Sequence, residues 1–234
     1  ISIDTWGVDF GLLDKNGRLL ANPYHYRDNR THSIPEKVFQ IISKDELYSK
    51  AGLQFIHFNT IYQLMYFKFN EPDVLERAEK MLMMPDLFGY MLTGEIKEEA
   101  TIASTSNLLN PYTKDWDFEL IKQLGLPESI FAPITKPGSV YGYLSDEICE
   151  ELGCDKVPVI AVASHDTASA VAATPSERDD FVYISCGTWS LFGIESKTPI
   201  LTTEAAKADF TNEGGFEDTT RFLKNIMGMW LIQE

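Results

Sequence analysis

The sequence predicts a protein of the α/β class. Apolar runs of strand length alternate, at irregular intervals, with segments that have helical periodicity and capping residues. The run over residues 157–163 has no polar alternation, which is typical of a strand buried on both faces of a parallel sheet. Farther along the chain, residues 186–188 separate two apolar stretches with a tight turn signal, as in a β-hairpin. Together these features predict one α/β domain followed by the start of another.

Composition narrows the possible functions. The chain has 234 residues, of which 44% are hydrophobic and 12% aromatic, so it can bury a sizeable core. The formal net charge of -15 argues against binding to nucleic acid or to an anionic membrane. Because no apolar run approaches the roughly 20 residues of a membrane span and no secretory leader opens the chain, we expect a cytoplasmic protein. The three cysteines lack zinc-site spacing and are expected to be free thiols.

The first half of the chain is expected to begin with strands and to continue mainly with helices. Two strands over residues 1–5 and 8–13 precede a turn at 14–17, which leads into a third strand at 18–21. A buried strand is expected at 81–84. Helices are expected where a capping residue or a first-turn proline opens a periodic run. They cover residues 43–52, 60–69, 72–80, 85–94, 117–125 and 145–153.

The second half is expected to contain a domain boundary. Residues 175–180 are polar and break regular structure, so we predict domains over 1–174 and 181–234, with a hinge between them. Strands at 181–185 and 189–194 form the hairpin, and residues 212–215 are expected to form a second turn. Both ends of the chain lie inside apolar patterns, so the sequence is expected to be part of a longer protein.

Asp166 is the candidate catalytic residue. It follows the apolar run directly, within Ser164, His165, Asp166 and Thr167, and small residues that can begin a helix come next. Open α/β sheets bind ligands at the carboxyl ends of their strands, and a helix N-terminus favours a negative charge there. A carboxylate in this place suits accepting a proton from an alcohol. The alternative is that Asp166 is only a helix N-cap.

Two other segments have groups suited to ligands. Gly187 allows backbone to approach a ligand closely, and the hydroxyl of Thr188 beside it can donate to phosphate oxygens. The alternative is an ordinary hairpin turn. Residues 24–31 carry groups that can bind hydroxyls or a carboxylate, with a solvated loop as the alternative.

Taken together, these motifs resemble the FGGY family of carbohydrate kinases. The fold implied by the resemblance is the actin-like ATPase fold, related to ribonuclease H, with most of the first domain and the start of the second. Within the family, the segments are most similar to the branch that phosphorylates L-rhamnulose. The similar segments are residues 3–10, 26–31, 58–64, 84–88, 92–94, 162–170, 186–190, 211–215 and 223–230.

The resemblance implies roles for individual residues. Asp166 matches the residue that accepts the proton. The positions that match sugar contacts are Gly7, His165 and Thr167. The positions that match the ATP site are Thr188, Asn225 and Gln233. Polar type and placement suggest three further residues near the sugar, which are Trp6, Asp9 and Arg27.

The implied reaction transfers the γ-phosphoryl group of ATP, with Mg²⁺ as a cofactor, to the 1-hydroxyl of L-rhamnulose. Asp86 stands where many relatives have lysine, which favours the L-rhamnulose branch over kinases of xylulose or glycerol. The alternatives are a kinase for another ketose or polyol, such as L-fuculose or L-ribulose, and a sugar-binding fragment without activity. The family's phosphate-binding loop is expected before Ile1, and its adenosine site beyond Glu234. The sequence does not predict the oligomeric state.

Overall fold

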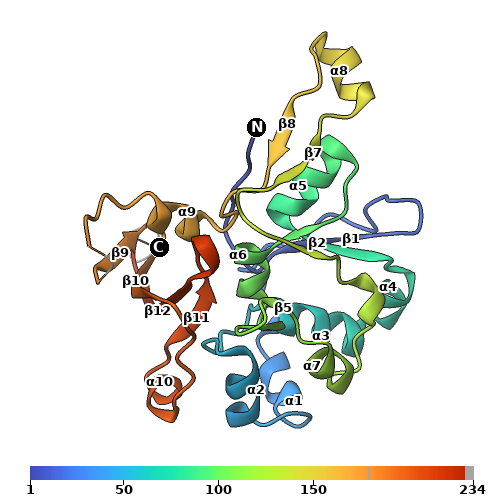
Figure 1. Ribbon diagram of the computed structural model, residues 1–234. Helices are drawn as coiled ribbons and strands as arrows, with labels where there is room; N and C mark the ends of the chain where they lie inside the picture. Colours follow the sequence, from blue (N-terminus) through green and yellow to red (C-terminus); the bar gives the residue numbers. More distant parts are fainter. Residues whose placement is uncertain (179, 230–234) are drawn as a thin grey trace.

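The computed structural model describes residues 1–178 and 180–229 (Figure 1). We call residues 1–173 the N-terminal lobe and residues 182–229 the C-terminal lobe. Figure 1 shows the C-terminal lobe as a separate sheet beside the larger mixed lobe, with helix α9 between them. No helix of the described residues is long and apolar enough to cross a membrane.

The N-terminal lobe contains short strands interspersed with helices. Its strands are β1 (Phe10–Leu13), β2 (Lys80–Met83), β3 (Glu98–Glu99), β4 (Leu109–Asn110), β5 (Asp115–Trp116), β6 (Ile134–Thr135), β7 (Val140–Tyr143) and β8 (Pro158–Ile160). Its helices are α1 (Ile34–Val38), α2 (Lys44–Ala51), α3 (Thr60–Asn70), α4 (Pro72–Arg77), α5 (Met84–Thr93), α6 (Ala100–Ala103), α7 (Phe118–Gln123), α8 (Asp146–Leu152) and α9 (Asp166–Ala172). Short 3₁₀ helices cover Asn29–Thr31, Ser104–Ser106 and Glu128–Ile130.

The C-terminal lobe is a four-stranded antiparallel sheet in the order β11-β12-β10-β9. Its elements are β9 (Val182–Cys186), β10 (Trp189–Ser196), α10 (Thr203–Lys207), β11 (Thr211–Gly214), the 3₁₀ helix Phe216–Asp218 and β12 (Thr220–Met227). The predicted hairpin between β9 and β10 is therefore confirmed.

The predicted helices of the N-terminal lobe are confirmed, with the caps that the sequence supplies. In α2 the Ser43 hydroxyl accepts a hydrogen bond from the amide of Glu46 at 3.2 Å, and Gly52 ends the helix with φ 70°. Gly94 and Gly153 end α5 and α8 in the same left-handed conformation. One helix end differs from the prediction. The helix expected to run to residue 80 ends at Arg77, and β2 begins at residue 80.

The strand expected over residues 157–163 is wrong in length and pairing. Only Pro158–Ile160 form a strand, and it is antiparallel to β7. The partner strand β7 begins at Val140, opposite Ile160, so residues 161–163 lie beyond the end of the partner strand. The strand ends at Ile160. Isolated parallel bridges nevertheless join Ser2 to Ile160 and Thr5 to His165.

Two predicted boundaries also need correction. The strand expected from residue 8 begins only at Phe10, because the amide of Asp9 donates to the carbonyl of Gly7 at 2.9 Å and closes a three-residue turn. The turn expected at 212–215 is mostly strand β11, and the chain turns after it, where the amide of Gly215 donates to the carbonyl of Thr219. Pairing with β12 outweighs the local turn preference of the Asn-Glu-Gly-Gly sequence.

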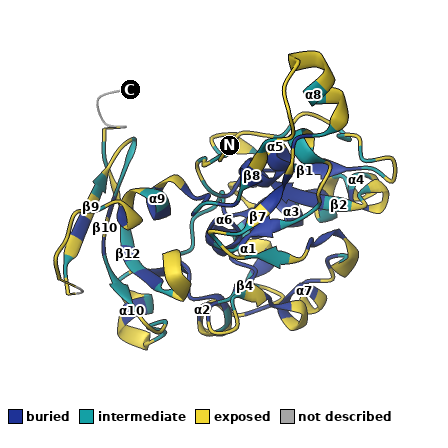
Figure 2. Ribbon diagram, turned by 45° about the horizontal axis from the view of Figure 1, so that its top comes forward, coloured by how far each residue is buried: buried dark blue, intermediate teal, exposed yellow. Residues whose placement is uncertain are grey.

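The packing of the two lobes places α9 between them. Figure 2 shows buried residues gathered in the strands and α3 at the centre of the N-terminal lobe. A second core joins Val171 of α9 to Tyr183, Leu191 and Leu223 on one face of the C-terminal sheet. Its other face exposes Ile184 and Phe192 to solvent. Because α9 packs on this sheet, its N-terminus lies where the two lobes meet.

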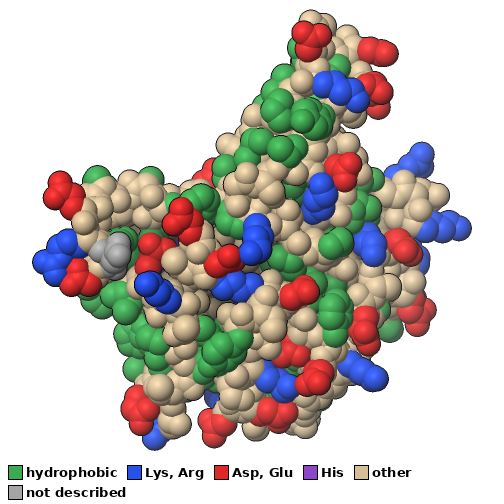
Figure 3. All heavy atoms as spheres, viewed as in Figure 1, with side chains coloured by type: hydrophobic (Ala, Val, Ile, Leu, Met, Phe, Trp, Pro, Cys, Tyr) green, Lys and Arg blue, Asp and Glu red, His purple; other side chains and the backbone are tan. Residues whose placement is uncertain are grey.

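Charged side chains are dispersed over the surface. On the face seen in Figure 3, acidic and basic side chains are interspersed, and apolar side chains lie between them. The negative net charge is therefore not gathered into one acidic region of this face.

Candidate functional site

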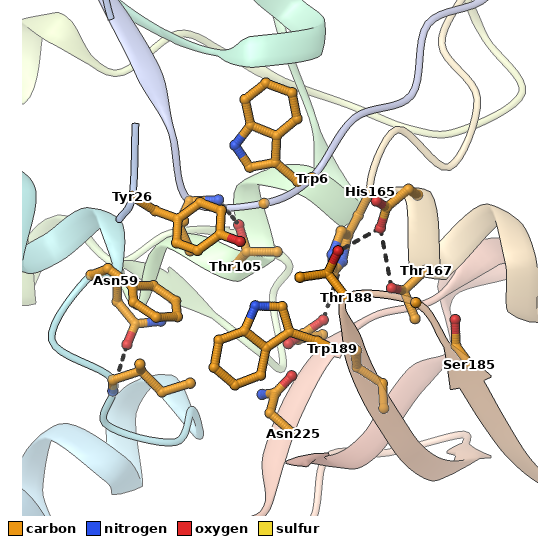
Figure 4. Close-up of a pocket in the computed structure, with 18 of the residues that line it drawn as sticks. Trp6, Tyr26, Asn59, Thr105, His165, Thr167, Ser185, Thr188, Trp189 and Asn225 are labelled. Carbon is orange, nitrogen blue, oxygen red and sulfur yellow. Dashed lines mark hydrogen bonds and ion pairs between the residues drawn. The ribbon is translucent and has the colours of Figure 1, made fainter. Parts of the chain in front are cut away.

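A cavity of about 570 Å³ lies between the two lobes (Figure 4). This volume is within the range of small-molecule sites. The N-terminal lobe lines it with Trp6, Gly7, Tyr26, Arg27, Phe58, Thr105, His165, Asp166 and Thr167, among others. The C-terminal lobe contributes Ser185, Gly187, Thr188, Trp189, Glu213 and Asn225, among others. The residues that the resemblance assigned to catalysis, to the sugar and to ATP therefore meet at one cavity within the described part of the chain, and Gln233 lies outside the described residues.

Asp166 is the first residue of α9, at the end of the bridged segment. The amide of Thr5 donates to the carbonyl of Ser164 at 3.0 Å, and the amide of Asp166 donates to the carbonyl of Thr5 at 2.9 Å. The N-cap of α9 is His165, so the alternative of Asp166 as an N-cap is wrong. The Asp166 side chain is 54% exposed and accepts a hydrogen bond from the Thr167 hydroxyl at 3.1 Å. It is fixed at its backbone and open at its carboxylate.

Two buried side chains hold the backbone just before Asp166. The carboxylate of Glu99 accepts from the amide of Ser164 at 3.0 Å and from the Thr101 hydroxyl at 2.5 Å. That hydroxyl in turn accepts from the amide of His165 at 3.2 Å. Burial raises the pKa of Glu99 despite these hydrogen bonds. This network fixes the backbone of Ser164 and His165, directly before Asp166.

The His165 ring lies between Asp166 and an ion pair of the C-terminal lobe. Its Nε2 atom is 3.6 Å from Asp166 Oδ1, and its Nδ1 atom is 2.9 Å from Arg221 Nη2 and 3.2 Å from Glu213 Oε2. Burial favours protonation of Glu213, but the positive charge of Arg221 and the hydrogen bond from Arg221 outweigh it. The pKa of Glu213 therefore lies below its ordinary value.

The cavity wall at Gly7 is tightly built. Val8 has a φ of 69°, which is an outlier for a β-branched residue. The turn is held because the amide of Val8 donates to the Thr105 hydroxyl at 3.0 Å and its carbonyl accepts from the Thr60 hydroxyl at 2.8 Å. A Cβ atom at Gly7 would lie about 3 Å from three Thr105 side-chain atoms. Glycine is needed here for close packing.

Aromatic rings form one wall of the cavity. The ring centroids of Tyr26 and Phe58 are 5.0 Å apart, and those of Phe58 and Trp189 are 5.9 Å apart. Figure 4 shows the side chains of Trp6, Tyr26 and Trp189 around the cavity. The contact between Phe58 and Trp189 joins the two lobes directly.

Contrary to the prediction, Asp9 does not line the cavity. It is 1% exposed, and its Oδ2 atom accepts from Trp6 Nε1 at 2.8 Å and from the amide of Tyr26 at 3.0 Å. Burial raises the pKa of Asp9, and these hydrogen bonds oppose that rise. Asp9 therefore orients two of the aromatic residues, whereas Trp6 and Arg27 line the cavity as expected.

The residues predicted for the nucleotide lie on the C-terminal lobe. Thr188 is at the tip of the β9–β10 hairpin, where the amide of Gly187 donates to the carbonyl of Trp189 at 2.8 Å. A Cβ atom at Gly187 would make one ordinary contact, with the carbonyl oxygen of Trp189 at 3.7 Å, so this glycine is not tightly packed. Asn225 is on β12, and its Nδ2 atom donates to Gln54 Oε1 at 3.2 Å.

Among residues 1–178 and 180–229, no three His, Cys, Asp or Glu side chains are grouped so that they could hold a metal ion. The cavity has two carboxylates, Asp166 and Glu213, and Glu213 is paired with Arg221. This arrangement fits Mg²⁺ that arrives on nucleotide phosphates better than an ion held by protein side chains alone. The cysteine side chains are free thiols, as predicted.

Sequence reasoning missed several residues of the site. Trp189 and Phe58 lay within recognised segments, and their aromatic type beside polar neighbours was a usable signal. Glu213 also lay within a recognised segment, residues 211–215. Thr105 and Arg221 gave no comparable signal, because their partners are distant in the chain or buried by sheet pairing.

Fold and site together define the class of protein, which is that of the actin-like ATPase fold with a ligand cavity between two lobes. Solved structures show the same fold. The ligand-bound xylulose kinase from Lactobacillus acidophilus matches with a TM-score of 0.83 and 21% identity, over 95% of this chain and 45% of that one. The glycerol kinase from Plasmodium falciparum with ADP matches with a TM-score of 0.81 and 15% identity, over 99% of this chain and 48% of that one.

The chain belongs to the FGGY family of carbohydrate kinases. Residues 1–172 match the family's N-terminal domain, and residues 182–234 match its C-terminal domain. The rhamnulokinase of Bacteroides thetaiotaomicron is 50% identical over 233 residues, covering 100% of this chain and 48% of the relative. The rhamnulokinase of Oceanobacillus iheyensis is 51% identical over 234 residues, covering 100% of this chain and 49% of the relative. The chain thus spans about half the length of these relatives.

Proposed function

We propose that the protein transfers the γ-phosphoryl group of ATP to the 1-hydroxyl of L-rhamnulose, giving L-rhamnulose 1-phosphate. The observation that carries the proposal is that Asp166 and Thr188, from different lobes, line one cavity. Relatives that are 50% and 51% identical and are named rhamnulokinases support the choice of sugar.

In this proposal Asp166 accepts the proton of the sugar hydroxyl. Its carboxylate is open to the cavity, while the amides of Ser164, His165 and Asp166 are all held by the N-terminal lobe. A fixed backbone with a free carboxylate is what a general base requires. A general base contributes a factor of about 100 to 10,000, whereas correct alignment of the reactants contributes about 7–11 kcal/mol. Positioning therefore contributes more than proton removal.

The sugar is proposed to lie against Gly7, His165 and Thr167, next to the aromatic wall. L-Rhamnulose has a methyl group at carbon 6, and burial of such a group is worth about 0.8 kcal/mol or more. The rings of Tyr26, Phe58 and Trp189 provide the apolar surface for it. The 6-hydroxy counterpart, L-fructose, would place a hydroxyl there.

The nucleotide is proposed to bind at the C-terminal lobe, with Thr188 and Asn225 near its phosphates. Gly187 lines the cavity and has no side chain, so phosphate oxygens could approach the hairpin backbone there. Gln233 is proposed as a further nucleotide contact. Mg²⁺ bound to the phosphates would neutralise charge during transfer. Residues 175–180 are proposed as the hinge that lets the lobes close and exclude water.

Phosphorylation assays with the full-length protein test the proposal. L-Rhamnulose should give the highest kcat/KM among L-rhamnulose, L-fuculose, L-ribulose, D-xylulose and glycerol. Since an apolar pocket rejects an added hydroxyl by roughly 100-fold at most, L-fructose should be disfavoured by about 10- to 100-fold. A preference for D-xylulose or glycerol would show that the sugar assignment is wrong. Binding of L-rhamnulose without transfer would favour a non-catalytic sugar-binding protein instead.

A further inference from the structure

The Glu213–Arg221 ion pair is buried where the C-terminal lobe meets His165. The two residues face each other across β11 and β12, and their side chains are 7% and 0% exposed. Glu213 Oε2 and Arg221 Nη2 are 3.0 Å apart. An ion pair so fully removed from water is costly to build unless each group finds further polar partners.

The pair finds such partners in two places. Arg221 Nε donates to the carbonyl of Gly214 at 2.8 Å, and Arg221 Nη2 is 2.9 Å from His165 Nδ1. Arg221 Nη1 is buried without a hydrogen-bond partner among the described residues. The guanidinium therefore has fewer acceptors than it has N–H groups, and His165 Nδ1 is one of the acceptors within its reach.

These contacts determine which ring nitrogen of His165 carries the hydrogen. A guanidinium has only donors, so an N–H on Nδ1 would point a second donor at Arg221 and remove one of its acceptors. Glu213 Oε2 is farther from Nδ1, at 3.2 Å, and already accepts from Arg221. Nδ1 is thus the acceptor, and in the neutral ring the hydrogen is on Nε2.

We propose that Glu213 and Arg221 are positioning residues, which orient the His165 ring and fix its Nε2–H tautomer toward the cavity. Nε2 is 3.6 Å from Asp166 Oδ1, so its hydrogen is available to a ligand oxygen beside the catalytic carboxylate. Because both positioning residues belong to the C-terminal lobe, that lobe completes a sugar contact of the N-terminal lobe. The sugar contact rests on the proposed function, whereas the tautomer does not.

The first test reads the tautomer directly in the unmodified chain without sugar. Long-range ¹H–¹⁵N NMR distinguishes protonated from unprotonated ring nitrogens, and the spectrum of His165→Gln assigns the signals of His165 among the four histidines. We expect an unprotonated Nδ1 and a protonated Nε2. A hydrogen on Nδ1 would overturn the proposal, whatever sugar the protein binds.

The second test is a double-mutant cycle on L-rhamnulose binding, measured by calorimetry. Glu213→Gln should raise the Kd by about tenfold in the unmodified background and by less than about twofold in the His165→Gln background. Equal effects in both backgrounds would mean that Glu213 acts on the sugar site without His165, and the proposal would fail. Glu119→Gln, whose exposed carboxylate pairs with Lys50 outside the cavity lining, is the matched control and should leave the Kd unchanged.

Circular dichroism separates a folding defect from a local effect. If Glu213→Gln does not fold, the NMR result on the unmodified chain still decides the proposal. If the unmodified chain does not bind L-rhamnulose, the proposed sugar is contradicted, and the tautomer result stands on its own.

Discussion

A Cβ atom added to Gly7 would lie 2.9 Å from Thr105 Cγ2, so these two residues pack with no room for a methyl group. Gly7→Ala should therefore lower the free energy of unfolding by about 1–3 kcal/mol, the usual cost of overpacking, and should weaken sugar binding. Urea unfolding measures the first effect and calorimetry the second. Gly187→Ala is the control, because its Cβ would meet only ordinary contacts. Equal stability of the two variants would contradict the packing argument.

Replacing Asp166 should separate turnover from binding. Asp166→Asn keeps the side-chain volume but cannot accept the proton, so kcat of the full-length protein should fall at least about 100-fold. The Kd for sugar should change little, because the backbone of this segment is held by Thr5 and Glu99. Steady-state kinetics and calorimetry measure the two quantities. Asp155→Asn, at an exposed position, is the control. Near-normal turnover of Asp166→Asn would remove the assignment of the base.

Replacing Thr188 should affect the nucleotide more than the sugar. Thr188→Ala removes one hydroxyl at the hairpin tip, and a lost hydrogen bond to a phosphate costs about 1–3 kcal/mol. The KM for ATP in the full-length protein should rise accordingly, while the KM for sugar stays nearly constant. Thr188→Ser keeps the hydroxyl and should restore most of the nucleotide affinity. A raised sugar KM with an unchanged ATP KM would place Thr188 at the sugar instead.

Asp86 should make the protein less stable as the pH rises. Burial raises the pKa of Asp86 from its ordinary value of 3.8 to about 7, and the charge of Glu99 adds to this rise. Burial raises the pKa of Glu98 as well. Between pH 3.8 and about pH 7, Asp86 keeps its proton in the folded protein and loses it in the unfolded chain. The free energy of unfolding therefore falls as the pH rises from about 4 to about 7.

Asp86→Asn tests this dependence, because an amide resembles the protonated carboxyl group. The stability of the variant relative to the unmodified chain should increase from about pH 4 to about pH 8 in urea unfolding. Asp155→Asn, at an exposed site, should show no such trend. A constant or decreasing difference for Asp86→Asn would mean that Asp86 is not protonated in the folded protein near neutral pH.

Much of the fold could be predicted because its signals are local. Ser43 and Gly52 define α2 through contacts within a few residues, and the hairpin around Gly187 depends on its own turn. The strand at residues 157–163 was overestimated because an apolar run does not say which neighbour it pairs with. Pairing of β11 with β12 likewise depends on a sheet partner that is remote in sequence.

The candidate site could be predicted only where it lies in a recognisable segment. Asp166 and Thr188 are both in such segments, and the structure brings them to the same cavity. Arg221 lies outside these segments, and the role of Glu213 within residues 211–215 could not be predicted, since it arises from a cross-strand pair with Arg221 buried against His165. Asp9 was expected at the cavity because residue type does not report burial, and it lies behind Trp6.

The attachment of the C-terminal sheet is uneven, and this has a mechanical consequence. Strand β11 is hydrogen-bonded to the N-terminal lobe, from the amide of Asn212 to Gly52 at 2.9 Å and from the amide of Gly214 to Ser104 at 2.7 Å. In the order β11-β12-β10-β9, the hairpin with Thr188 lies beyond the neighbouring strand. A rotation that preserves these bonds has its axis along β11, so the strands farthest from β11 are displaced the most. A small swing of the sheet would thus carry the hairpin tip toward or away from Asp166 while the hydrogen bonds of β11 stay intact, and it would shift the packing of the sheet on α9.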